Sequence, residues 1–218
     1  MIKSRVENRL PVAREGLPFI LIPLIAGGVF ILAGLKWPAY LFWAFGLFSV
    51  WFFRDPERIP PAEETAVLSP ADGRIIDIKN TEENRFLGTK ALKISIFMSI
   101  FNVHVNRVPL SGVIEDIKYF PGKFFSANLD KASGENEHNA IVLRTPGQER
   151  VAFVQIAGLV ARRIACWISP DEEVIRGQRF GLIRFGSRLD VYLPPTTKLT
   201  VTLKAKVQAG QSILGYLP

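Results

Sequence analysis

The distribution of apolar residues divides the chain into two regions of different periodicity. Across Leu17–Phe53 the only ionisable side chains are Lys36 and Tyr40. A break beginning at Lys36 separates a run of 19 residues, Leu17–Leu35, from one of 17 residues, Trp37–Phe53. As helices these runs would measure roughly 26–28 Å, close to the ~30 Å thickness of a bilayer's hydrocarbon core. The pattern predicts an N-terminal hydrophobic helical hairpin.

Three arrangements of this hairpin fit the sequence: two transmembrane spans, a hairpin dipping into one leaflet, or a buried helix pair of a soluble protein. The second half carries aromatic residues typical of membrane interfaces, namely Trp37, Tyr40, Trp43 and Trp51. Basic residues flank the segment, Lys3, Arg5, Arg9 and Arg14 before it and Arg54 and Arg58 after it. By the positive-inside rule both flanks are cytoplasmic. We therefore expect residues 1–58 to anchor the chain to the cytoplasmic face of the cell membrane.

From Ala66 onward the pattern changes to short apolar or alternating runs separated by Gly, Pro, Asn and Asp. The predicted strands are Gly73–Ile78, Leu92–Val108, Gly112–Phe120, Ala140–Arg144, Val151–Ala157, Arg179–Phe185, Arg188–Tyr192 and Leu199–Val207. This spacing predicts a mainly β (α+β) domain, either an antiparallel β sandwich or a partly closed barrel. A short helix is predicted over Ala157–Cys166. Because side chains alternate along a strand, Asn102, His104 and Asn106 are predicted to share one polar face.

Composition and charge favour a membrane-associated protein over a nucleic-acid binder. The 218 residues are 48% hydrophobic and carry a net charge of +7, of which +3 lies in residues 1–53 and +4 in residues 54–218. Zinc-ligand spacing, a helix-turn-helix pattern and aromatic-basic interleaving are all missing, so no nucleic-acid partner is expected. Beside an apolar anchor, basic residues suit anionic lipid head groups.

The cysteine and histidine content is too small for a metal site. Cys166 is the only cysteine, which excludes an intrachain disulfide and agrees with a reducing compartment. His104 and His138 are the only histidines and lie far from Cys166 in sequence, so no metal is expected. Between Phe120 and Asn139 a long polar segment interrupts the strands, and loops of that length are usually functional or mobile. It is predicted to be a lid over a lipid head group, with an inert loop as the alternative.

The peptide bond between Gly186 and Ser187 is the strongest candidate for chemistry. A serine that follows a glycine in a strained turn can attack the preceding carbonyl and break its own backbone, and glycine admits the backbone angles that such a turn needs. A Gly-Ser pair by itself is also an ordinary turn dipeptide. The surrounding sequence decides between these interpretations.

The stretch Gln178–Pro194 resembles the processing site of phosphatidylserine decarboxylases, specifically the short proenzyme form. Further segments resemble that family in the same order along the chain: Phe52-Phe-Arg-Asp-Pro-Glu-Arg58, Ser69-Pro-Ala-Asp-Gly73, Asn102-Val-His-Val-Asn-Arg107 with Pro109, Phe124–Ser133 and Val154–Arg163. The resemblance covers nearly the whole chain. Agreement at this many ordered places is improbable by chance.

The resemblance implies a self-processing enzyme that makes its own cofactor. Scission between Gly186 and Ser187 would give a β chain of residues 1–186 and an α chain of residues 187–218, with Ser187 converted to a covalent pyruvoyl group. Residues 59–218 would form the decarboxylase domain. The substrate would be phosphatidylserine, which forms a Schiff base with the pyruvoyl ketone and yields phosphatidylethanolamine and carbon dioxide. By the same resemblance Asp72 and His104 are catalytic together with Gly186 and Ser187.

The chain departs from the longer members of that family at one histidine. They carry two histidines three positions apart, the second of which is placed in the triad for self-cleavage; this chain has Arg107 there. His104 matches the first histidine, associated more with decarboxylation, so the group that deprotonates Ser187 stays open. His138 stands where relatives usually have arginine, and a catalytic role competes there with a loop side chain or a phosphate contact. Arg107 is the first candidate for holding the substrate phosphate. The Arg162-Arg163 pair is an equal candidate for a solvated or lipid-facing charge.

Several alternatives remain open at the level of sequence. An archaetidylserine decarboxylase would use the same mechanism, because the reaction occurs at the head group. A membrane-associated lipid serine hydrolase would need a strand-turn-helix context around Ser187 and the second glycine of Gly-x-Ser-x-Gly, which is absent. A carrier domain like biotinyl or lipoyl modules would need an exposed lysine at a hairpin tip. The oligomeric state is also open, with a homodimer of processed units as one candidate.

Overall fold

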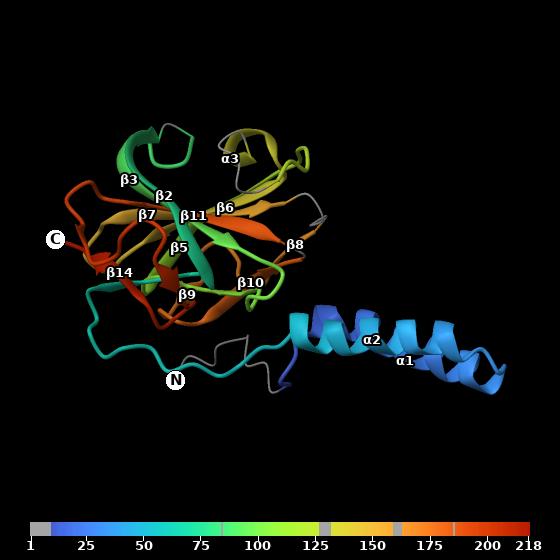
Figure 1. Cartoon of the computed structure of the whole chain (residues 1–218). Helices are drawn as coiled ribbons and strands as arrows, with labels where there is room; N and C mark the ends of the chain where they lie inside the picture. The colour runs from blue at the N-terminus through green and yellow to red at the C-terminus, as the bar shows by residue number, and fades with distance from the viewer. Residues whose placement is uncertain (1–9, 84, 127–131, 159–162, 185) are drawn as a thin grey trace. The chain divides into compact units, whose positions relative to one another are not determined.

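The computed structural model describes residues 10–83, 85–126, 132–158, 163–184 and 186–218. Within these residues the chain divides into two compact units, one ending at Glu57 and the other running from Arg58 to Pro218. The first contains two long helices and the second contains the strands (Figure 1).

The first unit is a helical hairpin, as predicted. A short 3₁₀ turn, η1 (Arg14–Gly16), leads into α1 (Leu17–Leu32), and α2 (Lys36–Phe52) follows. The break was predicted to begin at Lys36, but it lies earlier, where Gly34 takes a positive φ of 77° that suits glycine. Lys36 starts α2 because Pro38 is tolerated in the first turn of a helix, where its missing N–H has no intrahelical partner.

The two helices pack through small residues and leave apolar side chains outside. Gly27 lies against the indole of Trp43, whose Nε1–H donates to the Leu24 carbonyl oxygen at 3.2 Å. Large apolar side chains such as Ile22 and Trp37 remain exposed. Among the described residues, Arg14–Leu32 forms a helix long and apolar enough to cross a membrane. Insertion into a bilayer stays a prediction.

The second unit is mainly antiparallel β structure that curls into a partly closed barrel (Figure 1). One sheet has the order β13-β2-β3-β11-β7-β6-β5-β9, and two smaller sheets have the orders β1-β14-β12 and β4-β10-β8. The elements are β1 (Ala66–Leu68), β2 (Gly73–Glu83), β3 (Thr89–Met98), β4 (Val105–Arg107), β5 (Gly112–Phe120), α3 (Ala132–Glu135), β6 (His138–Arg144), β7 (Arg150–Ala157), β8 (Ile164–Cys166), β9 (Glu173–Val174), β10 (Arg179–Ile183), β11 (Ser187–Leu193), β12 (Lys198–Leu199), β13 (Lys206–Val207) and β14 (Ile213–Tyr216). The predicted fold class is confirmed.

Strand β11 occupies the middle of the large sheet, and all seven of its residues are buried. It pairs with β3 on one side and β7 on the other, so that Ser187 lies opposite Met98 and Ala157. Its alternate residues Leu189 and Val191 enter the main hydrophobic core, whereas Tyr192 joins a second apolar cluster on the other face of the sheet. Ser187 therefore faces the main core.

Three local predictions were wrong. The run Leu92–Val108 is not one strand, because a turn after Met98 separates β3 from β4, and β4 joins a different sheet. The predicted helix Ala157–Cys166 is replaced at its ends by strands β7 and β8, and residues 159–162 lie outside the described residues. The run Leu199–Val207 contains only the last residue of β12 and the two residues of β13, with Lys204 at a positive φ of 69° between them.

A buried charge cluster lies on the face of β11 opposite Ser187. Arg188 and Asp190 are fully buried, and Arg188 Nε donates to Asp190 Oδ1 at 2.6 Å. Arg188 Nη2 also donates to Ser95 Oγ at 2.8 Å, and Lys93 Nζ lies 3.2 Å from Asp190 Oδ2. Each of these charges depends on the others, because an unpaired charge is costly in a low-dielectric interior.

Replacing Asp190 with alanine would leave Arg188 and Lys93 buried without their carboxylate. We expect Asp190→Ala to lower the free energy of unfolding by about 3–5 kcal/mol. The exposed pair Lys118–Asp116 supplies the control, since Asp116→Ala should cost about 1 kcal/mol or less. Urea unfolding in detergent measures both, followed by the β-sheet circular dichroism signal in chains that carry Ser187→Ala so that the backbone is continuous. Equal effects of the two substitutions would contradict the role of the cluster.

Candidate active site

The Gly186–Ser187 peptide bond lies at the entry to the central strand. Gly186 has a positive φ of 74°, in the left-handed region that favours glycine, and Ser187 is the first residue of β11. The Ser187 side chain is fully buried, and its Oγ has no hydrogen-bond partner among the described residues. A buried hydroxyl without a partner is unusual in a folded protein and marks a site that needs an explanation.

His104 points one ring nitrogen at this peptide. The turn between β3 and β4 carries it, and the Asn102 carbonyl oxygen accepts from its Nδ1 at 3.0 Å. Its Nε2 lies 3.4 Å from the backbone nitrogen of Gly186. Because a backbone N–H can only donate, Nε2 is the acceptor and the ring proton sits on Nδ1. The structure thus brings a basic lone pair of His104 to the backbone N–H of Gly186, one residue before Ser187.

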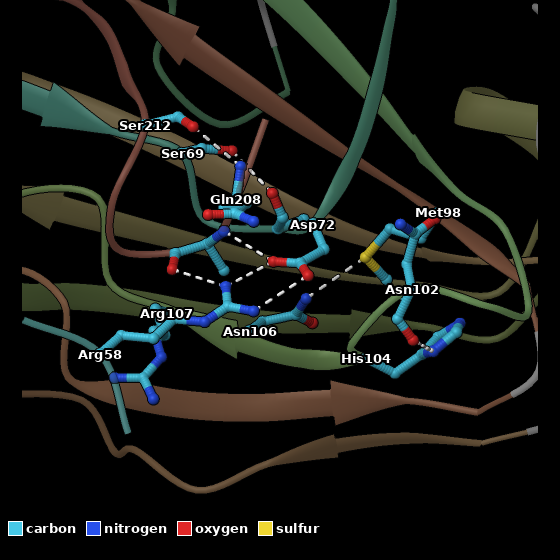
Figure 2. A network of polar contacts seen from close by, with 12 residues as sticks. Arg58, Ser69, Asp72, Met98, Asn102, His104, Asn106, Arg107, Gln208 and Ser212 are labelled. Atoms are coloured by element: carbon cyan, nitrogen blue, oxygen red, sulfur yellow. Dashed lines mark hydrogen bonds and ion pairs between the residues drawn. The ribbon is translucent and has the colours of Figure 1, made fainter. Parts of the chain in front are cut away.

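The Asp72 carboxylate is held by two groups from distant parts of the chain (Figure 2). Arg58 contacts both oxygens, at 2.5 Å from Nη1 and 3.0 Å from Nη2. The backbone N–H of Ala209 donates to the same carboxylate at 2.8 Å, and Arg58 also donates to the Ala209 carbonyl oxygen. Asp72 follows strand β1 and precedes β2, which pairs with β3 beside β11. Its catalytic role stays a prediction.

Three buried side-chain amides form a hydrogen-bonded chain on the Ser187 face of the sheet, and the sequence pattern predicted only one of them. Asn106 Nδ2 lies 3.6 Å from the sulfur of Met98, the residue paired with Ser187 (Figure 2). Gln155 Nε2 donates to Asn106 Oδ1 at 2.9 Å, and Asn139 Nδ2 donates to Gln155 Oε1 at 3.1 Å. Strand alternation indicated Asn106. The other two amides come from β7 and β6, and only sheet register brings them to it.

Arg58 is also a site residue that sequence reasoning left without a role. It ends the Phe52–Arg58 segment, which was assigned to the anchor, and its guanidinium is almost fully buried against Asp72. The signal was its place in a motif that resembles the decarboxylase family. Nothing local in the sequence links Arg58 to Asp72, 14 positions away.

His138 lies on the face of the sheet opposite Ser187. It pairs with Ile156, which in turn pairs with Arg188, and its ring stacks on Phe120 with centroids 4.6 Å apart. Burial lowers the pKa of His138, so its neutral form is favoured. The structure therefore does not bring His138 together with Ser187.

The other side chains that the sequence singled out have separate locations and contacts. Arg107 is buried and donates to the Gly177 carbonyl oxygen at 2.9 Å. Arg163 is exposed, and Arg162 lies outside the described residues. Cys166 is half-buried, and burial raises the pKa of its thiol, which favours the less reactive protonated form. Within the described ranges, no group of three or more His, Cys, Asp or Glu side chains could hold a metal ion.

Comparison with known proteins places this site in a family. The family model described as phosphatidylserine decarboxylase matches residues 45–215. Phosphatidylserine decarboxylase proenzyme of Desulfotalea psychrophila is 47% identical over 97% of this chain and 99% of its own length. The proenzymes of Syntrophus aciditrophicus and Ralstonia nicotianae are 52% and 49% identical, each over 94% of this chain and 96% and 95% of their own lengths. The chain belongs to the phosphatidylserine decarboxylase family.

The left-handed conformation of Gly186 yields a test of this geometry. A Cβ added there would have Ile100 Cγ2 as its nearest neighbour at 4.0 Å, so Gly186→Ala fits sterically and its cost is conformational. We expect a loss of about 1–2 kcal/mol in the free energy of unfolding. Gly147→Ala, at a glycine with room and no positive φ, should change it by roughly 0.5 kcal/mol or less. Urea unfolding of both variants in the Ser187→Ala background measures the difference, and equal losses would contradict a left-handed conformation at Gly186.

Proposed function

We propose that this chain is a pyruvoyl-dependent phosphatidylserine decarboxylase that cleaves itself between Gly186 and Ser187. Membership of the family implies a decarboxylase, and the proenzyme names of its relatives imply two chains from one precursor. The observation that carries the finer proposal is the juxtaposition of Gly186, the unpartnered Ser187 hydroxyl and His104 Nε2. These three groups are what intramolecular attack on a peptide bond requires.

Scission begins with attack of Ser187 Oγ on the Gly186 carbonyl carbon. The C–N bond breaks, an ester forms through Oγ, and the proton of the hydroxyl passes to the released nitrogen of Ser187. His104 Nε2 lies 3.4 Å from the backbone nitrogen of Gly186, one residue before the serine, and is the base that we propose for this proton transfer. Gly186, at a positive φ, has no side chain to shield its carbonyl carbon. The buried Ser187 Oγ has no hydrogen bond among the described residues that the attack would have to break.

Elimination then separates the chains. Loss of a proton from Ser187 Cα expels the Gly186 carboxylate, which ends the β chain of residues 1–186. Water hydrolyses the resulting dehydroalanine and releases ammonia, which leaves the pyruvoyl group at the head of the α chain. The residues on the Ser187 face fit such a group, because they are buried and include the neutral amides of Asn106 and Gln155.

The pyruvoyl ketone, once formed, supplies the electron sink that loss of carbon dioxide from an amino acid requires. His104 is placed to donate a proton at the same position, and Asn106 and Gln155 present neutral hydrogen-bonding groups in a water-poor setting. Asp72 holds Arg58 and Ala209, and Ala209 lies in the α chain, so that interaction fastens the two chains together beside the site.

The proposal also assigns a role to each part of the chain. Residues 1–58 serve as the membrane anchor, residues 59–218 as the decarboxylase domain, and the phospholipid substrate reaches the site from the cytoplasmic face of the cell membrane. A lipid serine hydrolase is disfavoured, because Ser187 opens a strand and not the helix that follows a nucleophile elbow.

Replacing Ser187 with alanine tests scission directly. The wild-type chain should give a fragment of 32 residues whose N-terminus reacts with borohydride or hydroxylamine, whereas Ser187→Ala should stay intact at 24.4 kDa and release no carbon dioxide. Mass spectrometry of the purified protein and a carbon dioxide assay measure the two outcomes. An intact wild-type chain with an unmodified serine would sink the proposal, and continued scission of the variant would move the reactive bond elsewhere.

Replacing His104 tests the proton-transfer role. We expect His104→Ala to slow scission and carbon dioxide release by about 10²-fold or more, the usual effect of losing a positioned general base. His138→Gln, on the opposite face of the sheet, supplies the matched control and should leave scission unchanged. Time courses of chain cleavage on denaturing gels measure the first rate. Cleavage of His104→Ala at the wild-type rate would assign the base to another group.

A further inference from the structure

The turn that joins β3 to β4 exposes two large apolar side chains at its tip. Ile100 is 40% exposed and Phe101 is 64% exposed. The turn is fixed by Asn102, whose Oδ1 accepts from the backbone nitrogen of Ser99 at 2.9 Å and from Ser99 Oγ at 2.8 Å. The backbone nitrogen of Asn102 donates back to the Ser99 carbonyl oxygen at 3.0 Å. Exposed turns usually carry Gly, Pro, Asn, Asp or Ser at their tips, so an apolar pair held in place here requires a reason.

This apolar tip adjoins the candidate active site. Ile100 Cγ2 is the nearest atom to the position that a Cβ would take on Gly186, at 4.0 Å. The Asn102 carbonyl oxygen at the base of the same turn accepts from His104 Nδ1. One short turn therefore carries exposed apolar side chains at its tip and orients the histidine at its base.

Two arginines, Arg163 and Arg184, stand at the adjoining ends of the paired strands β8 and β10. Arg184 is two positions before Gly186 and is partly exposed, and its backbone nitrogen contacts the carbonyl oxygen of the exposed Arg163 at 3.4 Å. Apolar side chains flanked by arginines match the interface of an anionic bilayer, where apolar groups enter the acyl boundary and cations meet head groups.

We propose that the turn Ser99–Asn102 is a docking element that places Ile100 and Phe101 in the interface of an anionic bilayer. The inference rests on the proposed function, because a diacyl substrate has to present its head group at Gly186 and Ser187 while its chains stay in the membrane. A protein partner fits this turn less well than a bilayer does. Two side chains on a tight turn offer far less than the ~800 Å² per partner of a stable protein interface, whereas a single aromatic side chain suffices at a bilayer.

A fluorescent label tests the docking without using activity. Phe101→Cys and Ile175→Cys, each in a full-length Cys166→Ala chain, are labelled with an environment-sensitive dye and reconstituted in phosphatidylglycerol–phosphatidylcholine vesicles with brominated acyl chains. Ile175 is the matched control, because it is 53% exposed and precedes β10, whereas the site follows that strand. We expect a blue shift and bromine quenching at position 101 only. Equal quenching at both positions, or none at position 101, would overturn the proposal.

A kinetic ratio separates docking from chemistry. Each chain is assayed on long-chain phosphatidylserine in vesicles and on a short-chain phosphatidylserine that stays monomeric. For Phe101→Asp we expect the ratio of vesicle to monomer turnover to fall about tenfold, as withdrawal of one large apolar side chain from an interface implies. Ile175→Asp should leave the ratio unchanged. Equal losses on both substrates would overturn docking in favour of an effect on His104.

The two experiments also keep this proposal distinct from the function on which it rests. If the wild-type chain decarboxylates neither substrate and yet the dye at position 101 is quenched, the assigned reaction is wrong and the docking element stands. If the monomeric substrate is decarboxylated normally and no quenching occurs, the reaction stands and the docking element is wrong.

Discussion

The hydrogen-bond ladder on both sides of β11 is the constraint on which the rest of the structure depends. Seven consecutive residues, beginning with Ser187, pair with β3 on one side, and six of them also pair with β7 on the other. A strand bonded along both edges and buried on both faces cannot shift register without moving every side chain to the wrong face. The left-handed turn at Gly186 is therefore followed directly by a residue whose register in the sheet is fixed.

The same strand separates two kinds of chemistry by side-chain alternation. The Ser187 face carries neutral groups, including Asn106 and Gln155, whereas the opposite face carries the paired charges of Arg188 and Asp190. Because adjacent residues point to opposite faces, full charges lie close to the reactive residue in sequence and remain on the other side of the sheet. Within the described residues, the ion pair of Arg188 and Asp190 lies on the other face of the sheet from Ser187, and the amides on the Ser187 face are neutral.

Sequence patterns predicted what depends on local order along the chain. The apolar hairpin and the mainly β class follow from runs of residue types, and the candidate Gly186–Ser187 peptide follows from motifs. The turn at Ser99–Asn102 was missed because β-favouring residues continue through it, and only the side chain of Asn102 shows where the strand stops. The contact of Arg58 with Asp72 and the alignment of Gln155 with Asn106 depend on tertiary pairing, so no local pattern could reveal them.

The segment after Ser187 is fastened to its surroundings by more than β11. It also supplies β12, β13 and β14, which pair within two different sheets, and its Ala209 is bonded to Asp72. Under the proposed scission the native particle would keep its hydrodynamic size, and an affinity tag placed after Pro218 would retrieve both polypeptides in equal amounts. Separation of the two polypeptides would require a denaturant. Size-exclusion chromatography under native conditions would therefore not distinguish cleaved from uncleaved protein.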